Sequence, residues 1–163
     1  MSALISKERY CLDQIFNANE TGLNYKMLPG TTFALQSEIS APSPKKAKER
    51  ITVMTCSNAS GSFRLPLTVI GKSAKPRAVK NINRNALPVF YTDQKSAWMT
   101  VSIFKNWFFE EFVPRVLKFL RENGLLEKIL LILDNAPSHP SIRELKCKGV
   151  KVIYAPPKTT SLI

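Results

Sequence analysis

The sequence predicts an α/β domain built on a mixed β-sheet. Three observations carry this prediction: two β-rich runs that enclose a short Asn/Gly loop, one long amphipathic stretch, and two apolar runs near the C-terminus. They indicate an antiparallel hairpin, a helix, and two strands that are buried on both faces. With 163 residues, of which 44% are hydrophobic and 22% charged, the chain has the length and composition of one globular domain.

The first half of the chain predicts strands. Residues 14–23 have a short apolar start at Ile15 and Phe16 and continue with polar residues, which indicates a strand with a polar C-terminal end. Residues 51–56 and 62–71 are β-rich and enclose the turn-forming residues 58–61, so we expect an antiparallel hairpin. Because proline cannot donate to a strand ladder, Pro66 predicts an edge strand or a bulge in the second arm.

The second half predicts a helix followed by two strands. Residues 102–123 carry apolar side chains at three- and four-residue spacing, which predicts a helix that Pro114 kinks or splits. Residues 128–134 and 150–155 are apolar runs of strand length, and a short helix is expected between them at about 140–148.

Cysteine, histidine and apolar-run counts exclude several classes of protein. The three cysteines are scattered and form no CxxC pair, and His139 is the sole histidine, so disulfide scaffolds, His-rich zinc sites and two-histidine mechanisms are excluded. No run reaches the roughly 18 apolar residues of a membrane span, and no apolar region near the N-terminus is typical of a signal peptide. We therefore expect an intracellular, reducing location and no membrane partner.

The charge balance favours a nucleic-acid partner. The chain has 24 Lys and Arg against 12 Asp and Glu, a formal net charge of +12, which produces a broad positive potential. Phosphate backbones are common targets of such patches because each contact releases a counterion. The candidate contacts lie in two segments: Lys45, Lys46, Lys48 and Arg50, and then Lys72, Lys75, Arg77, Lys80 and Arg84. The alternatives are a solvated surface or, for the first segment, a nuclear-import signal.

Polar residues follow three of the predicted strands, at 17–20, 134–139 and 155–161. Functional groups of α/β sheets gather at the carboxyl ends of strands. Asp134 is the strongest candidate, since an aspartate that ends a buried strand is costly unless it is hydrogen-bonded or holds a cation; a turn or capping aspartate fits the pattern equally. Ser138 and His139, in the loop that follows Asp134, supply residue types of a hydrolase triad. A role in the loop and in helix capping is favoured, because neighbours in one loop rarely form a catalytic relay.

Five blocks of the sequence resemble a known family. NANETGL, VIGKSAKPRAVKN, AWMTVSIFKNWF, LLILDNAPSHP and YAPPKTTSLI occur in the order found in the DDE-type transposase domain of the pogo/Tigger/Jerky group. The resemblance runs from about Gln14 to Ile163, which makes 14–163 the domain and 1–13 an N-terminal lead-in. It implies an RNase H-like (DDE transposase) α/β fold, with a mixed five-stranded sheet flanked by helices on both sides.

The resemblance also implies two-metal phosphoryl transfer, in which three acids hold two Mg²⁺ or Mn²⁺ ions. The second family acid falls on Asp134, which is the metal ligand that this chain retains. The first falls on Asn19, where relatives have aspartate, and the third would lie beyond Ile163. Glu20 is adjacent, but neighbouring strand residues point to opposite faces, so its substitution for the missing acid would need a bulge or turn.

These departures predict a transposase-derived, endonuclease-like domain that binds DNA and has impaired cleavage and weak metal binding. Two alternatives stay open: an active Mg²⁺-dependent endonuclease or transposase domain that tolerates Asn19, and a domesticated protein-interaction scaffold. The resemblance further implies a nuclear location and allows a homo-oligomer.

Overall fold

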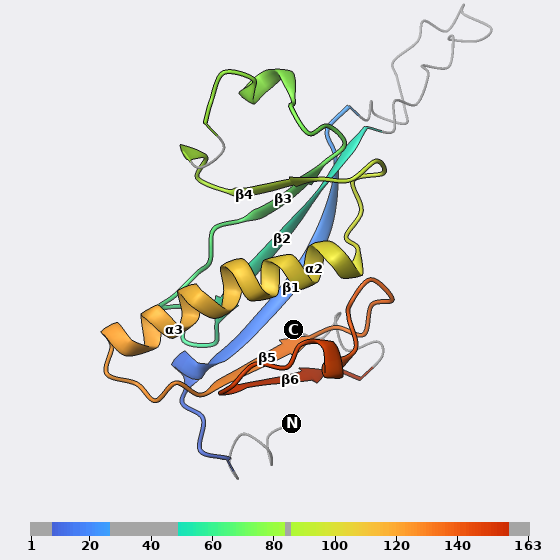
Figure 1. The fold of residues 1–163 in the computed structure, drawn as a ribbon. Helices are drawn as coiled ribbons and strands as arrows, with labels where there is room; N and C mark the ends of the chain where they lie inside the picture. The colour runs from blue at the N-terminus through green and yellow to red at the C-terminus, as the bar shows by residue number, and fades with distance from the viewer. Residues whose placement is uncertain (1–7, 27–48, 84–85, 157–163) are drawn as a thin grey trace, which may run out of the picture.

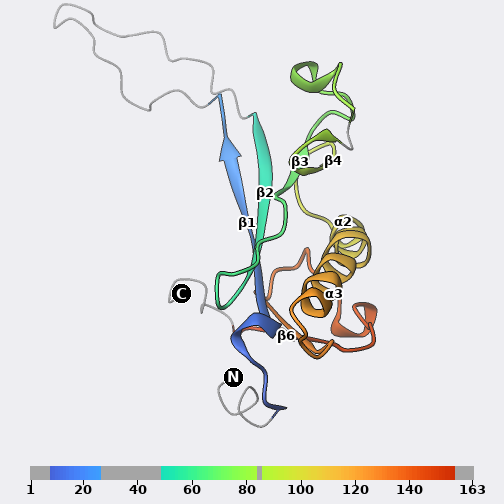
Figure 2. The ribbon, with the colours of Figure 1, turned by 90° about the vertical axis from the view of Figure 1, so that its left-hand side faces the viewer.

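The computed structural model describes residues 8–26, 49–83 and 86–156. These residues form one mixed sheet with an α-helical layer on one face (Figures 1 and 2). Lys45, Lys46, Lys48 and Arg84, and the segment 157–163, lie outside the described residues.

The sheet has six strands in the order β4-β3-β2-β1-β5-β6. They are β1 (Ile15–Asn24), β2 (Arg50–Asn58), β3 (Thr68–Gly71), β4 (Phe90–Asp93), β5 (Ile129–Leu133) and β6 (Val150–Tyr154). The strands β1, β2 and β3 pair antiparallel, whereas β5 pairs parallel with β1 and with β6. The α/β class and the mixed sheet of the RNase H-like expectation are thus confirmed.

The expectation of five strands is wrong by one, because residues 90–93 form the additional strand β4. It pairs parallel with β3 at the sheet edge, from Thr68↔Phe90 to Gly71↔Asp93. The strand is only four residues long and follows a proline, so it carries too few alternating positions to be recognised from hydrophobic periodicity.

The second arm of the hairpin is shorter than predicted. Pro66 lies before β3, which begins at Thr68, and the preceding part of the arm touches β2 at a single bridge between Ser57 and Arg64. Pro66 has no N–H to donate to the ladder, and the regular strand therefore begins only after it. β3 itself is not an edge strand, since β4 covers it.

The predicted long helix is present, with a change of hydrogen bonding in its middle. It consists of α2 (Val101–Trp107), the π-helical turn η4 (Phe108–Phe112) and α3 (Val113–Glu122), which follow one another along one face of the sheet (Figure 1). The backbone N–H of Val113 donates to Phe108 O, five residues earlier. A proline removes one hydrogen bond and crowds the preceding turn, and the wider turn directly before Pro114 accommodates it.

The main core lies between this helix and the sheet. Its largest fully buried side chains include Phe16, Phe104, Trp107, Phe108, Phe112, Leu131 and Leu133. The rings of Phe16 on β1 and Phe112 on η4 meet edge to face at a centroid distance of 5.6 Å. The aromatic residues of the helix are therefore core residues, as their shared helical face predicts. The α-helices were expected on both faces of the sheet, and α2 and α3 both lie on the same one (Figure 2).

The opposite face of the sheet has a smaller apolar cluster of Tyr10, Ile15 and Leu130. Lys128 Nζ lies 3.4 Å from Glu8 Oε2, so residues of the predicted lead-in contact the sheet.

The predicted helix at about 140–148 is instead the single 3-10 turn η5 (Ile142–Glu144). Ser141 begins it with a capping box, in which its backbone N–H donates to Glu144 Oε2 at 3.0 Å. Gly149, at φ +79°, lies directly before β6. No helix among the described residues is long and apolar enough to cross a membrane.

Candidate functional site

The two residues predicted for the catalytic site come from neighbouring parallel strands. The last regular pair between β1 and β5 is Asn17↔Ile132, and Asn17 Nδ2 donates to Ile132 O at 3.1 Å. Continued by two residues, this register brings the backbone positions of Asn19 and Asp134 next to each other at the carboxyl ends of β1 and β5. The side chain of Asp134, however, lies with those of Glu20 and His139.

Asn19 offers a neutral, exposed side chain at this position. Its Oδ1 accepts the backbone N–H of Glu20 at 3.0 Å, so the amide is turned back onto its own strand. An amide oxygen can be a ligand of a hard cation, but it brings no negative charge to balance that cation.

Glu20 points away from Asn19 and contacts the loop after β5 through His139. Glu20 Oε1 lies 3.0 Å from His139 Nε2, and His139 Nδ1 lies 2.9 Å from the main-chain oxygen of Asp134. One ligand atom from each of Glu20, Asp134 and His139 falls within 4.8 Å of the others. Glu20 thus joins the site from a regular strand, without the bulge or turn that the sequence seemed to require, because the loop after β5 folds back toward it.

Glu20 and His139 lie in this group, although the sequence predicted a role for Glu20 only with a bulge or turn and favoured a capping role for His139. The turn that returns His139 to the site is closed by a hydrogen bond from His139 N to Ala136 O at 3.0 Å. The available signal was the position of the sole histidine in a proline-containing loop directly after Asp134.

His139 is the most buried polar side chain of this site, with 1% of the side chain exposed. Its ring packs 4.6 Å from the ring of Phe104 and 6.2 Å from that of Tyr154. Burial of the ring lowers the pKa of His139, but the hydrogen bond to Glu20 and the negative charges of Glu20 and Asp134 together outweigh it. The net effect raises the pKa of His139 above its ordinary value, because both carboxyl groups favour the imidazolium form.

Asp134 carries an acceptor that the protein leaves without a hydrogen bond. Its Oδ1 is buried and lies 3.2 Å from His139 Nδ1, whose hydrogen bond goes to the main-chain oxygen of Asp134. The side chain as a whole is 31% exposed, so the carboxylate remains accessible from outside. A partly exposed carboxylate is a ligand type that hard cations prefer. At this end of the sheet the described residues supply the carboxylates of Asp134 and Glu20 and the imidazole of His139, with the neutral amide of Asn19 on the neighbouring strand position.

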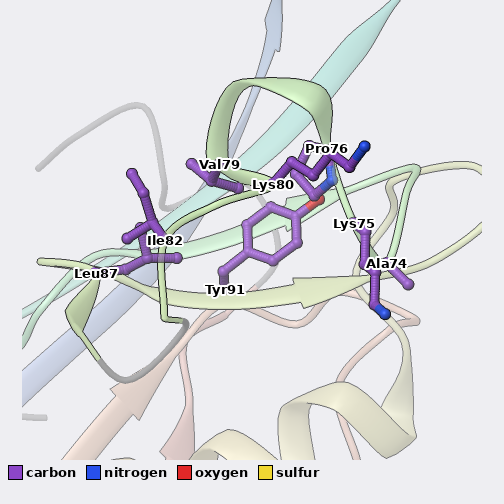
Figure 3. Close-up of a pocket in the computed structure, with 8 residues that line it drawn as sticks. All are labelled: Ala74, Lys75, Pro76, Val79, Lys80, Ile82, Leu87 and Tyr91. Atoms are coloured by element: carbon purple, nitrogen blue, oxygen red, sulfur yellow. The ribbon is translucent and has the colours of Figure 1, made fainter.

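The second basic segment lies on the loop between β3 and β4, away from Asp134. Its residues Lys72, Lys75, Arg77 and Lys80 are all exposed. β4 is the edge of the sheet and β5 lies on the far side of β1, so the structure does not bring this loop and Asp134 together (Figure 1). Lys75 and Lys80 line a pocket of about 300 Å³ beside Tyr91 (Figure 3).

Arg50, the one described residue of the first basic segment, is held by an aromatic ring. Its guanidinium carbon lies 3.9 Å from the ring centroid of Trp98, and Nη2 donates to Thr52 Oγ1 at 3.2 Å. A Cβ at Gly22 would lie 2.4 Å from Arg50 Nη2, so glycine leaves the space that the guanidinium fills. Trp98 is 56% exposed, and the contact between it and Arg50 was not predicted from the sequence.

Comparison with known proteins places this chain in a family. The sequence profile described as DDE superfamily endonuclease matches residues 48–163. Tigger transposable element-derived protein 7 of Homo sapiens is 37% identical over 169 residues, covering all of this chain and 31% of that protein. Jerky protein homolog of Homo sapiens is 40% identical over 163 residues, covering 99% of this chain and 28% of that protein.

A solved structure, the Mos1 transposase paired-end complex with left transposon end, is 14% identical with a TM-score of 0.49 and covers 93% of this chain and 38% of that chain. The present chain spans less than a third of the length of the two human relatives. The profile match covers well over half of the chain, and the identities to the Tigger and Jerky proteins extend over almost all of it. The chain belongs to the DDE superfamily endonuclease family and, within it, is related to the Tigger-derived and Jerky proteins.

Proposed function

We propose that this chain is a transposase-derived DDE endonuclease-like domain that binds DNA and whose strand-cleavage chemistry is impaired. One observation supports the second part: two residues beyond the last regular β1–β5 pair, Asn17↔Ile132, this chain has the neutral Asn19. Divalent cations that activate a phosphoryl transfer need carboxylate charge at this position, and an amide supplies none.

Asp134 would hold a Mg²⁺ or Mn²⁺ ion through the carboxylate of its side chain, which is 31% exposed, and Asn19 would add at most a neutral amide oxygen. Such an ion, when bound, polarises a phosphate oxygen and lowers the pKa of water. The protein contributes orientation: the contact from His139 to the main-chain oxygen of Asp134 fixes the loop that carries the carboxylate. Glu20 in turn orients the imidazole from the neighbouring strand.

The DNA-binding part of the proposal is supported by charge and by the family description. The chain carries a net charge of +12, and the exposed residues Lys75, Arg77 and Lys80 cluster on one loop. An endonuclease family acts on nucleic acid, and binding dominated by phosphate contacts falls steeply with salt. We expect a linear decrease of the logarithm of the binding constant with the logarithm of salt concentration.

Nicking of supercoiled plasmid in Mg²⁺ and in Mn²⁺, with plasmid binding measured in parallel, tests both parts. The wild type should bind the plasmid, and any nicking should be unchanged by Asp134→Ala. Nicking that requires both the metal and Asp134 would show that the site works with Asn19 and would overturn the impaired-cleavage proposal. Absence of plasmid binding by the folded protein would overturn the DNA-binding proposal.

Asn19→Asp tests the role of the missing charge directly. The variant should bind Mn²⁺ about tenfold more tightly, or better, in a calorimetric titration, which corresponds to about 1.4 kcal/mol. Asn24→Asp, at the exposed far end of the same strand, is the matched control and should leave the affinity unchanged. Equal Mn²⁺ affinity of the Asn19 variant and the wild type would contradict a cation site at Asp134.

We also propose a nuclear location, supported by the segment that contains Lys45, Lys46 and Lys48. A fluorescent fusion should accumulate in nuclei, and replacement of these three lysines by alanine should spread it through the cell. Nuclear accumulation that survives the triple replacement would exclude this segment as the signal.

A further inference from the structure

The loop between β3 and β4 encloses a pocket that the catalytic-site argument does not use. It has a volume of about 300 Å³ and combines apolar side chains with two lysines. Figure 3 shows the ring of Tyr91 in the middle of this lining, with Lys75 and Lys80 from the loop beside it. The other lining residues are Ala74, Pro76, Val79, Ile82 and Leu87.

Tyr91 is fixed in this position before any ligand binds. Its hydroxyl donates to the main-chain oxygen of Ser73 at 2.7 Å, which ties β4 to the loop. A Cβ at Gly71 would lie 2.2 Å from the Tyr91 hydroxyl oxygen and 3.0 Å from Cζ, so the ring occupies space that only glycine leaves open. A preset aromatic ring loses little conformational entropy when it stacks on a ligand.

The charge around the pocket points to an anionic ligand. Residues 72–91 contain five lysines and arginines and no aspartate or glutamate. Lys72 lies near Glu49, where hydrogen bonds from Lys26 and Tyr25 lower the pKa of the carboxyl and the charge of Lys72 adds to their effect. Lys75 and Lys80 are the lysines of this loop that line the pocket.

We propose that this pocket binds one unpaired nucleotide of a DNA strand, an inference that rests on the DNA-binding part of the proposed function. The base would stack on Tyr91 among the apolar side chains, and Lys75 and Lys80 would contact the adjoining phosphates. Aromatic rings combined with a positively charged groove are the usual means of binding unpaired nucleotides.

An acidic amphipathic peptide is the competing occupant. A helical peptide of this kind needs a groove that receives apolar anchors along several turns. The pocket here is a single compartment around one ring, which favours a single planar group.

Fluorescence anisotropy with three labelled duplexes tests the proposal. One duplex is fully paired, the second carries a single unpaired thymidine, and the third has an abasic site in place of that thymidine. The wild type should bind the second duplex about 5- to 100-fold more tightly than the other two, the range that stacking of one base supplies. Equal binding of all three would overturn the proposal.

Five variants test whether the pocket is the source of the preference for the unpaired duplex. Tyr91→Ala should abolish it and Tyr91→Phe should keep it, because the ring remains. Ile82→Glu, at a residue that is 49% exposed, adds a negative charge to the pocket wall without disturbing the core and should also abolish it. Lys75→Ala and Lys80→Ala should each weaken binding to every duplex and reduce the salt slope by about one.

The outcomes separate failure of this inference from failure of the proposed function. Wild-type protein that binds none of the duplexes contradicts DNA binding itself. Protein that binds all duplexes but keeps its preference in both Tyr91→Ala and Ile82→Glu contradicts only the pocket. Displacement of the unpaired duplex by an acidic amphipathic peptide, with the peptide binding more tightly than the DNA and losing affinity in Tyr91→Ala, would make the peptide the occupant instead.

Discussion

Glu20 Oε1 and His139 Nε2 lie 3.0 Å apart, although 119 positions separate the two residues in the chain. The imidazole connects β1 to the loop that begins at Asp134, because its other nitrogen contacts the main-chain oxygen of that residue. With 1% of the His139 side chain and 14% of the Glu20 side chain exposed, water screens this contact little. Loss of the Glu20 charge should therefore be measurable both in the pKa of His139 and in the stability of the fold.

Glu20→Gln should lower the pKa of His139. In the wild type that pKa is raised above its ordinary value of 6.5. Burial of the ring lowers the pKa, and the hydrogen bond and charge of Glu20 are the main effects that raise it. His139 is the sole histidine in the sequence, so its ring protons give one unambiguous NMR titration. Glu110→Gln, at an exposed glutamate, is the matched control and should leave the midpoint of the His139 titration unchanged. A midpoint unchanged by Glu20→Gln would contradict the contact.

The same substitution should reduce stability in a pH-dependent way. A group whose pKa is higher in the folded state than in the unfolded state stabilises the fold fully below the unfolded pKa, and this contribution disappears as the pH rises through the folded pKa. Glu20→Gln should thus lower the free energy of unfolding in urea by about 1–3 kcal/mol below pH 6.5. The difference should shrink at alkaline pH; a difference that is constant across this range would exclude the imidazolium as its source.

Phe112→Ala should be among the most destabilising changes in the helix. Phe112 is fully buried and meets the rings of Phe16 at 5.6 Å and Trp107 at 5.3 Å. Loss of the ring leaves a cavity, and we expect a decrease of about 3–5 kcal/mol in the free energy of unfolding. Phe109, in the same π-helical turn but 38% exposed, is the matched control, and Phe109→Ala should cost about 1 kcal/mol or less. Equal losses would contradict the helical register set by η4.

Gly149→Ala and Gly61→Ala separate backbone strain from steric overlap. Both glycines have positive φ, +79° and +76°, where a side chain costs about 1–2 kcal/mol. A Cβ at Gly61 meets nothing within 4 Å, whereas at Gly149 it would lie 2.4 Å from the main-chain oxygen of Glu127. Urea denaturation should therefore show a clearly larger loss for Gly149→Ala. A larger loss at Gly61 would contradict the close approach of the two backbone segments.

The three cysteines should react with a thiol reagent in the order of their exposure. Cys11 is exposed, Cys147 is half-buried and Cys56 is buried in the core. Burial raises the pKa of the Cys56 thiol, which keeps it protonated and unreactive. Under native conditions Cys11 should be modified first and Cys56 only after unfolding, as peptide mapping would show. Rapid modification of native Cys56 would be inconsistent with its place in the core.

Elements with a clear apolar period were predictable from the sequence. The strands at 129–133 and 150–154 and the helix near 102–123 carry their burial pattern locally, and the structure contains all three. Two short elements were not predicted correctly. β4 is too short to show a pattern, and the expected helix before β6 shrinks to η5.

The same division holds for the site. The sequence by itself determined that Asn19 and Asp134 follow apolar strand segments. Its resemblance to the family further showed that an amide stands at position 19, where relatives have an acid. Only the tertiary structure decided that Glu20 meets His139 and that Tyr91 lies over Gly71 beneath a basic loop. Periodicity within a strand fixes the face on which a side chain lies, but which residue it meets there depends on chain segments that pair from far apart in the sequence.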